Sequence, residues 1–367
     1  MDVDAPEVET QRGRRMRTVR RILVIQTAFI GDVILTLPLI QVLKQFFADA
    51  AIDVVVVPRS AAVCRNHPSI NQVIEYDKRG SEKGVANLVR FGLRLRKNGY
   101  DLAIVPHRSI RSGVLAFLAG PALRIGFKRS MGRFLMTKTV LYKEELHEVE
   151  RNLSLLGALG IKDFGRELPR VFPGSEEAAA VDDRLAEAGI PGGSRLVAIA
   201  PGTVWNTKRW LKDRFALLAQ QFVAEGFTPV LVGGPEDNSL CSEIMHLADS
   251  DLMANMAGKL SLLESAELIR RCVFAVSNDS APMHLAVAVG TPVVAIFGAT
   301  VPQFGFAPYG PNDAVVEVRG LSCRPCSIHG GPRCPIKTFV CMKNITHDRV
   351  FAKAMDVLER AQSGKLH

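Results

Sequence analysis

The chain has 367 residues, of which 47% are hydrophobic and 23% charged, so it is long enough for about two globular domains and is not a disordered polymer. Its 46 Lys and Arg against 37 Asp and Glu give a net charge of +9, which suits an anionic partner such as a phosphorylated lipid, a nucleotide or a nucleic acid. The longest apolar run, residues 285–301, is interrupted by Gly290, Pro292 and Gly298, so no segment offers the roughly 20 apolar residues of a membrane-spanning helix.

The first 20 residues mix acidic residues with arginines and lack the apolar core of a secretory signal. We therefore expect residues 1–20 to form a flexible tail. Four of the seven cysteines fall between residues 323 and 341, which does not resemble the disulfide framework of a secreted domain. A reducing cytoplasm suits this cysteine usage better.

Strands and helices are predicted to alternate from residue 21 onward. The continuous apolar run at 21–26 is typical of a strand that is buried on both faces, and it is followed by a loop at 27–32 and a helix at 33–47. Further strands are predicted at 52–57 and 102–106, and further helices at 85–97 and 114–119. Residues 21–168 are thus predicted to form an α/β domain with a parallel sheet.

The pattern lapses at residues 164–173, where two prolines and several charges favour an extended connector. Beyond it, strands are predicted at 196–200, 228–232, 273–277 and 292–297, and helices at 176–188, 214–225, 238–247, 262–271 and 282–289. Residues 169–346 are therefore predicted to form a second Rossmann-like domain with a cysteine-rich insert at 323–341. Residues 347–367 are expected to form a C-terminal helix that packs back on the N-terminal domain.

Three polar stretches follow predicted strands, where loops lead into helix N-termini that attract anions. The first contains Gly31 and Asp32. Asp32 either caps the helix or acts as a carboxylate that takes a proton from a substrate hydroxyl. The position of Asp32 at the start of the predicted helix by itself favours the capping role.

The second stretch, residues 201–210, combines the hydroxyls of Thr203 and Thr207 with the cations of Lys208 and Arg209. This composition suits phosphate oxygens, although a solvated basic loop explains it equally well. The third stretch is Ser-Asn-Asp-Ser-Ala-Pro-Met-His at 277–284. Helix capping explains much of it, and a diphosphate docked on the helix N-terminus explains its polarity.

Taken together, these stretches resemble the lipopolysaccharide heptosyltransferases of glycosyltransferase family 9, from about residue 21 to residue 360. The resemblance rests on five ordered motifs: IGDVILTLP at 30–38, PGTxWxxKRW at 201–210, VGGPED at 232–237, AGKLSL at 257–262 and SNDSAPMH at 277–284. It implies the GT-B fold, in which two Rossmann-like domains with parallel sheets face each other across a cleft. The N-terminal domain would then bind the acceptor and the C-terminal domain the nucleotide sugar.

The resemblance also implies roles for individual residues. Asp32 matches the catalytic base and Glu236 the carboxylate that meets the ribose hydroxyls. The diphosphate contacts match Thr203, Lys208, Asp279, Ser280 and His284. Ala281 stands where glycine is usual, and a positive φ at that position would cost about 1 kcal/mol.

The implied reaction is an inverting displacement without a bound metal. It would transfer heptose from ADP-heptose to a phosphorylated lipid A-core acceptor at the cytoplasmic face of the inner membrane. Asp32 would deprotonate the acceptor hydroxyl, and Lys208 with the helix near Ser280 would neutralise the leaving diphosphate. The arginines of the N-terminal tail either touch anionic headgroups or are simply solvated, and the basic residues of the acceptor half either meet phosphates or carboxylates of a lipid-borne sugar or are ordinary surface charge. The basic residues assigned to the acceptor half are Arg59, Arg108, Arg111, Lys128 and Arg129.

Several alternatives stay open. Cys323, Cys326, Cys334 and Cys341 have the ligand count of a structural zinc site, with His329 and His347 as spare ligands, or they form a redox-labile loop. One alternative is that the donor is a nucleoside-diphosphate sugar other than ADP-heptose. Another is that the chain is a sugar-nucleotide epimerase on the same scaffold. A nicotinamide-dependent oxidoreductase is disfavoured because the first strand is not followed by GxGxxG. A nucleic-acid partner is disfavoured because only 7% of residues are aromatic.

Overall fold

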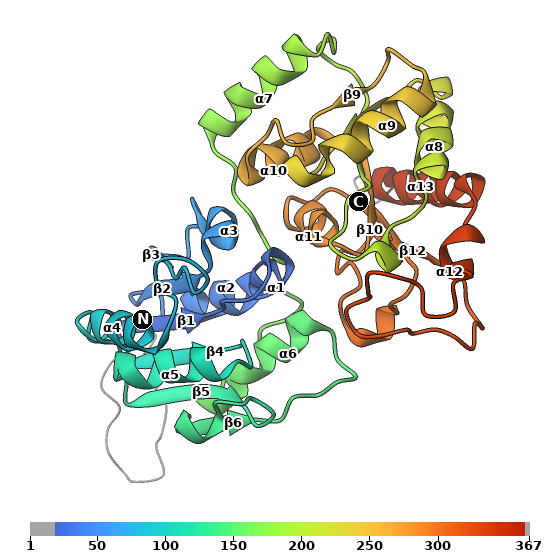
Figure 1. The fold of residues 1–367 in the computed structure, drawn as a ribbon. Helices are drawn as coiled ribbons and strands as arrows, with labels where there is room; N and C mark the ends of the chain where they lie inside the picture. The colour runs from blue at the N-terminus through green and yellow to red at the C-terminus, as the bar shows by residue number, and fades with distance from the viewer. Residues whose placement is uncertain (1–18, 364–367) are drawn as a thin grey trace. The chain divides into compact units, whose positions relative to one another are not determined.

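The computed structural model describes residues 19–363, so most of the predicted N-terminal tail, residues 1–18, lies outside the described part. The chain divides into two compact units between Pro169 and Arg170. Each unit contains one six-stranded sheet (Figure 1). Residues 161–174, which include the predicted connector at 164–173, contain no helix or strand.

The sheet of the first unit is parallel throughout, with the order β3-β2-β1-β4-β5-β6. This is the strand order of Rossmann folds. Its strands are β1 (Arg21–Ile25), β2 (Ala51–Val56), β3 (Gln72–Glu75), β4 (Leu102–Val105), β5 (Leu123–Phe127) and β6 (Lys138–Val140). Val24 of β1 lies between Val54 of β2 and Ile104 of β4, so an apolar run supplies the centre of the sheet.

Helices cover this sheet on both sides. They are α1 (Ile30–Ile34), α2 (Leu37–Phe46), α3 (Pro58–Ala61), α4 (Val85–Arg96), α5 (Ile110–Ala119) and α6 (Glu148–Ser154). Helices α4 and α5 pack side by side on one face, where Phe91 and Leu115 join Leu23 and Ala103 of the strands in one apolar core. Burial of this core, and not helix propensity, supplies most of the stability of such helices.

The sheet of the second unit repeats this arrangement in the order β12-β11-β10-β7-β8-β9, and all of its strand pairs are parallel. Counted from its own first strand, this is again the Rossmann order. Its strands are β7 (Leu196–Ala200), β8 (Thr228–Leu231), β9 (Ala254–Asn255), β10 (Phe274–Asn278), β11 (Val293–Phe297) and β12 (Ala314–Glu317).

The helices of the second unit are α7 (Ser175–Glu187), α8 (Lys212–Ala224), α9 (Asn238–Ala248), α10 (Leu262–Arg271), α11 (Ala281–Ala288), α12 (Val340–Lys343) and α13 (His347–Ser363). Helix α13 packs on α8 and on strands β10 to β12 through Val350, Ala354 and Val357. This packing lies within the second unit, and the expected packing of the C-terminal helix on the N-terminal domain stays a prediction.

The predicted helix at 33–47 is wrong in one respect. The structure has two helices there, because α1 ends at Ile34 and Pro38 occupies the first turn of a new helix, α2. Proline fits a first turn but not a helix interior, since it lacks an N–H group. The sequence patterns also missed the short strands β3, β5, β6, β9 and β12.

Candidate active site

Both sheets place polar loops where their strand order reverses. In a Rossmann sheet, ligands bind beyond the carboxyl ends of the strands at this reversal, which lies between β1 and β4 in the first unit and between β7 and β10 in the second. Asp32 follows β1, Thr203 and Lys208 follow β7, and Asp279 and Ser280 follow β10. Each unit therefore has its own candidate site.

Asp32 lies in the first turn of α1 and is partly buried. Its carboxylate accepts the Phe29 N–H at 3.2 Å, so Asp32 caps the helix from the third helical position of a capping box, whereas the N-cap residue itself is Phe29. Burial, assisted by the negative charge of Glu148, raises the pKa of Asp32 from 3.8 to about 6. Above this pH Asp32 is ionised and is a stronger base than an ordinary aspartate.

Glu148, at the start of α6, is held in a buried polar network. Its Oε2 accepts the Tyr142 hydroxyl at 3.0 Å and the Arg151 Nη1 at 2.9 Å. The Arg108 guanidinium lies 4.0 Å from the centroid of the Tyr142 ring. This network fixes one negative charge close enough to act on the pKa of Asp32, while Arg108 partly offsets it.

Cationic side chains gather around the same end of the sheet. Lys78 donates to the Thr27 carbonyl at 2.5 Å, and Arg111 donates to the Lys78 carbonyl at 3.3 Å. Burial, with the positive charges of Lys78 and Arg108, lowers the pKa of His107 to about 4, so this imidazole is neutral at pH 7. The group suits an anionic ligand.

Not all of the predicted acceptor residues join this group. Arg108 and Arg111 belong to it through the contacts above. Arg59 is exposed on the short helix α3, Lys128 is exposed, and Arg129 is exposed and pairs with Glu144.

In the second unit, Lys208 and Asp279 form a buried ion pair. The Lys208 Nζ lies 2.7 Å from the Asp279 Oδ2, and the Thr300 hydroxyl donates to the same oxygen at 2.6 Å. The side chains of Lys208 and Asp279 are only 16% and 8% exposed. The structure thus brings together two of the predicted diphosphate residues and adds Thr300, which follows β11.

Asn278, at the end of β10, fastens the 201–210 loop to the sheet. Its Nδ2 donates to the Pro201 carbonyl at 2.9 Å, and its Oδ1 accepts the Trp210 N–H at 3.0 Å. Thr203 lies in the loop between these two anchors, where its hydroxyl donates to the Trp205 carbonyl. Asn278 and Thr300 were not among the predicted site residues, although both follow or end a strand.

Helix α11 begins directly after Ser280. The Ser280 hydroxyl lies 3.4 Å from the Asn278 carbonyl, and the Met283 N–H donates to the Ser280 carbonyl. His284 is buried in the helix. Ala281 is the first residue of α11, and its φ is not positive. The strain considered for an alanine at this position therefore does not arise.

The cysteine-rich segment packs against the Lys208 loop. Thr207 exchanges two hydrogen bonds with Gly331, because its hydroxyl accepts the Gly331 N–H at 2.7 Å and its own N–H donates to the Gly331 carbonyl at 3.1 Å. Gly330 has a φ of +84°, and a Cβ placed there would lie 2.9 Å from the Lys208 Cγ. Only glycine therefore permits this close approach without a shift of Lys208.

The four cysteines of this segment are free thiols. Within residues 19–363, no group of three or more His, Cys, Asp or Glu side chains is arranged so that it could hold a metal ion. The zinc site therefore stays a prediction.

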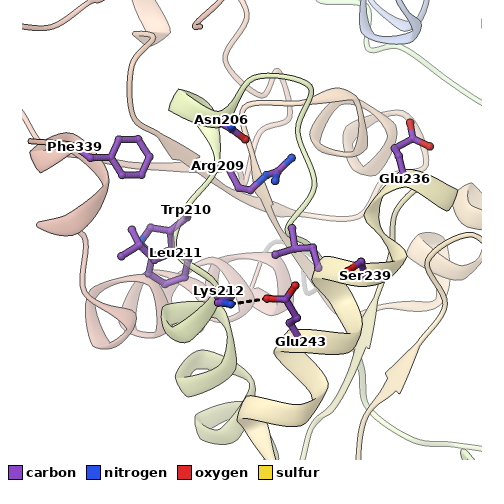
Figure 2. Close-up of a pocket in the computed structure, with 10 residues that line it drawn as sticks. Asn206, Arg209, Trp210, Leu211, Lys212, Glu236, Ser239, Glu243 and Phe339 are labelled. Carbon is purple, nitrogen blue, oxygen red and sulfur yellow. Dashed lines mark hydrogen bonds and ion pairs between the residues drawn. The ribbon is translucent and has the colours of Figure 1, made fainter. Parts of the chain in front are cut away.

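A pocket of about 510 Å³ lies beside the same loop (Figure 2). Arg209 lines it from the loop and Glu236 from the turn that precedes α9, and the apolar side chains of Leu211, Leu240 and Phe339 also line it. Glu236 is thus brought near the Lys208 loop, although Lys208, Thr203 and Asp279 do not line this pocket.

Comparison with known proteins identifies the family. The sequence model of one protein family, glycosyltransferase family 9 (heptosyltransferase), matches residues 88–332. The chain belongs to this family. As a glycosyltransferase of family 9, it is 31% identical to lipopolysaccharide heptosyltransferase 3 of Escherichia coli K12 over 282 residues, which are 74% of this chain and 80% of that protein.

This glycosyltransferase is also 28% identical to lipopolysaccharide heptosyltransferase 2 of Salmonella typhimurium over 298 residues, which are 77% of this chain and 84% of that protein. Among solved structures, the family 9 glycosyl transferase from Veillonella parvula matches with a TM-score of 0.84 at 24% identity, covering 93% of this chain and 98% of that one. The predicted fold class, α/β with the two Rossmann-like sheets of GT-B glycosyltransferases, is confirmed. Of the helices within residues 19–363, none has the length and apolar character that crossing a bilayer requires.

Proposed function

We propose that this glycosyltransferase transfers a heptose from ADP-heptose to the phosphorylated inner core of lipopolysaccharide. Two relatives, heptosyltransferases 2 and 3, carry lipopolysaccharide in their names, which supports this acceptor class. The observation that carries the donor side is the buried pair of Lys208 and Asp279 at the strand reversal of the second unit. A cation held beside a helix N-terminus suits a leaving diphosphate.

The proposed reaction is a single inverting displacement that needs no bound metal. Asp32 removes the proton from the acceptor hydroxyl while that oxygen bonds to the anomeric carbon of the heptose. The bond from this carbon to the diphosphate oxygen breaks, and ADP leaves with the electron pair. The Lys208 ammonium and the first N–H groups of α11 stabilise the charge that develops on the diphosphate.

Within this proposal, Asp279 is a positioning residue. An ionised carboxylate only accepts hydrogen bonds, so it cannot donate one to a diphosphate oxygen. Its Oδ2 instead holds the Lys208 ammonium and the Thr300 hydroxyl. Thr203, Ser280 and His284 stay proposed diphosphate contacts, and Glu236 stays the proposed partner of the ribose hydroxyls.

The acceptor side rests on the cations near Asp32. We assign Arg108 and Arg111 to phosphates of the lipid A-core acceptor, because guanidinium groups bind phosphate oxygens in pairs. We place the enzyme in the cytoplasm, in peripheral contact with the anionic inner face of the inner membrane.

The test is ADP release from a panel of nucleotide sugars, with and without lipid A-core acceptor. Wild-type protein should release ADP from ADP-heptose only when acceptor is present. Asp32→Asn should lower kcat by roughly 10²–10⁴-fold, the usual contribution of a general base. Asp49→Asn, an exposed aspartate after α2, is the matched control and should behave as wild type.

Three outcomes contradict parts of the proposal. Turnover retained in Asp32→Asn excludes Asp32 as the base. Conversion of the sugar nucleotide without acceptor indicates an epimerase. Faster turnover of another nucleoside-diphosphate sugar means that this sugar, and not heptose, is the group transferred.

A further inference from the structure

The positive charge of the chain is concentrated in one segment of the first unit. Between residues 78 and 143 the sequence contains fifteen Lys and Arg but only two acidic residues, Glu82 and Asp101. The whole chain carries an excess of nine positive charges, so the rest of the chain is net acidic. This segment includes α4, α5 and the loop 128–136 that follows β5.

Helices α4 and α5 and this loop form one continuous outer layer. Both helices bury their inner faces in the same core, and Gly92 of α4 fits closely against Leu118 of α5. On the other side of α5, Gly113 approaches Gly132 of the loop, and the Met131 N–H donates to the Arg108 carbonyl at 3.1 Å. The outer faces of these elements therefore turn away from the sheet together (Figure 1).

This outer layer exposes six large apolar side chains. Val85, Val89 and Leu93 follow one another at every fourth position of α4 and are 77%, 38% and 46% exposed. Such spacing places them in one stripe along the helix. Three more come from α5 and the loop: Phe117 (51%), Met131 (66%) and Phe134 (73%). Single exposed apolar residues are ordinary, but a group on adjoining elements indicates an interaction surface.

Exposed cations lie among these apolar side chains. They are Arg90, Arg96 and Lys97 on or next to α4, and Lys128, Arg129 and Arg133 in the loop. Neither helix nor the loop contains an acidic residue. Two local ion pairs, Arg94 with Glu82 and Arg129 with Glu144, leave the surface strongly basic.

We propose that this α4–α5 surface, made of the six apolar and six basic residues named above, docks the enzyme on an anionic lipid bilayer. Its apolar side chains enter the boundary between headgroups and acyl chains, while the Lys and Arg side chains contact headgroup phosphates. A dissolved phosphate makes no contact with an apolar stripe, and a nucleic acid, which is bound through its phosphates and by base stacking, gains nothing from the stripe of Val85, Val89 and Leu93. The inference is independent of which sugar is transferred.

The test is co-sedimentation of the full chain with vesicles. Vesicles of phosphatidylethanolamine with phosphatidylglycerol provide the anionic surface, and vesicles of phosphatidylcholine provide the neutral one. Wild-type protein should bind the anionic vesicles, bind less at high salt, and not bind the neutral ones. Because the N-terminal tail is present in every variant, differences between variants report on the α4–α5 surface.

Two sets of substitutions separate the contributions. The apolar set is Val89→Ser, Leu93→Ser and Phe134→Ser, and the basic set is Arg90→Gln, Lys97→Gln and Arg133→Gln. Near an anionic membrane each cation contributes about five-fold to binding, so the basic set should lower the partition coefficient on the order of a hundred-fold. The apolar set should lower it at least ten-fold. Thermal unfolding shows whether each variant still folds.

Matched substitutions in the second unit serve as controls. Leu247→Ser with Leu252→Ser changes two exposed apolar residues. Arg184→Gln, Lys343→Gln and Arg360→Gln remove three exposed cations. Both control sets should bind vesicles as wild type does.

The proposal is overturned if wild-type protein does not bind the anionic vesicles, or if folded variants of both sets bind them as tightly as wild type does. Loss of binding in the basic set alone also overturns it, because that result indicates a site for soluble anions without insertion of apolar side chains. Since vesicle binding is measured without donor or acceptor, failure of this proposal leaves the proposed transfer reaction intact, and the reverse also holds.

Discussion

Replacing Asp32 by asparagine should make the first unit more stable at neutral pH while it abolishes the proposed base. The carboxylate is desolvated and faces the charge of Glu148, so its ionised form is disfavoured in the folded state. An asparagine amide is uncharged and still offers an oxygen to the Phe29 N–H that Asp32 now accepts. The substitution therefore removes the cost of the charge and keeps the cap.

The size of the effect follows from the pKa of Asp32, which folding raises from 3.8 to about 6. Between these values the folded state holds more protons than the unfolded state, so the free energy of unfolding of wild-type protein falls as the pH rises through this window. The shift of about 2 units corresponds to about 3 kcal/mol as an upper limit, because each unit is worth 1.36 kcal/mol. Asp32→Asn lacks this loss, so its advantage over wild type grows from near zero at pH 4 to about 2–3 kcal/mol at pH 8.

The assay is urea unfolding of both proteins at pH 4.5, 6 and 8. Circular dichroism follows the whole chain, whereas tryptophan fluorescence reports only on the second unit, because both tryptophans, Trp205 and Trp210, lie there. The fluorescence transition should be the same in wild type and variant. If the two proteins show parallel stabilities across this pH range, Asp32 does not carry a raised pKa and the electrostatic description of its site is wrong.

Two further predictions concern the 201–210 loop. Lys208→Met should destabilise the second unit by about 3–5 kcal/mol, because it leaves the buried Asp279 carboxylate unpaired, and should weaken ADP binding at least ten-fold in titration calorimetry. Adding Asp279→Asn should restore stability but not ADP affinity; a double variant as unstable as the single one would exclude the ion pair as the cause. Thr207→Val should cost about 1–3 kcal/mol by removing the acceptor of the Gly331 N–H, and should speed hydrogen exchange at that amide. Unchanged exchange there would mean that the hydroxyl does not hold the cysteine-rich segment.

The sequence predicted the parts of the fold that depend on long apolar runs. Strands such as β1 and β7 are buried along nearly their whole length and stand out in the chain, so they were located within a residue or so. Strand β3 is largely exposed or half-buried, and β9 has only two residues, so neither leaves an apolar pattern to recognise. Pro38 indicates that a new helix begins near it, because proline fits a first turn but not a helix interior. The apolar spacing around Pro38 nevertheless favoured one continuous helix.

The candidate site was predictable only in part. Strand ends and helix starts are visible in the sequence, which is why Asp32, Lys208 and Asp279 could be named. The partners that determine their chemistry are distant in the chain: Glu148 acts on Asp32 from α6, and Thr300 meets Asp279 across 21 positions. Such contacts follow from the order of the strands, which one sequence does not reveal. The roles of the site residues stay proposals.

The connector at residues 161–174, which contains no helix or strand, has a practical consequence. Each sheet is assembled from strands of one unit alone, and the C-terminal helix α13 covers the sheet of its own half. The carboxy-terminal half from Arg170 onward thus contains every strand its core requires, and it is a natural candidate for separate expression. A fragment of that size would allow the proposed nucleotide binding to be studied by NMR without the half that carries the proposed membrane surface.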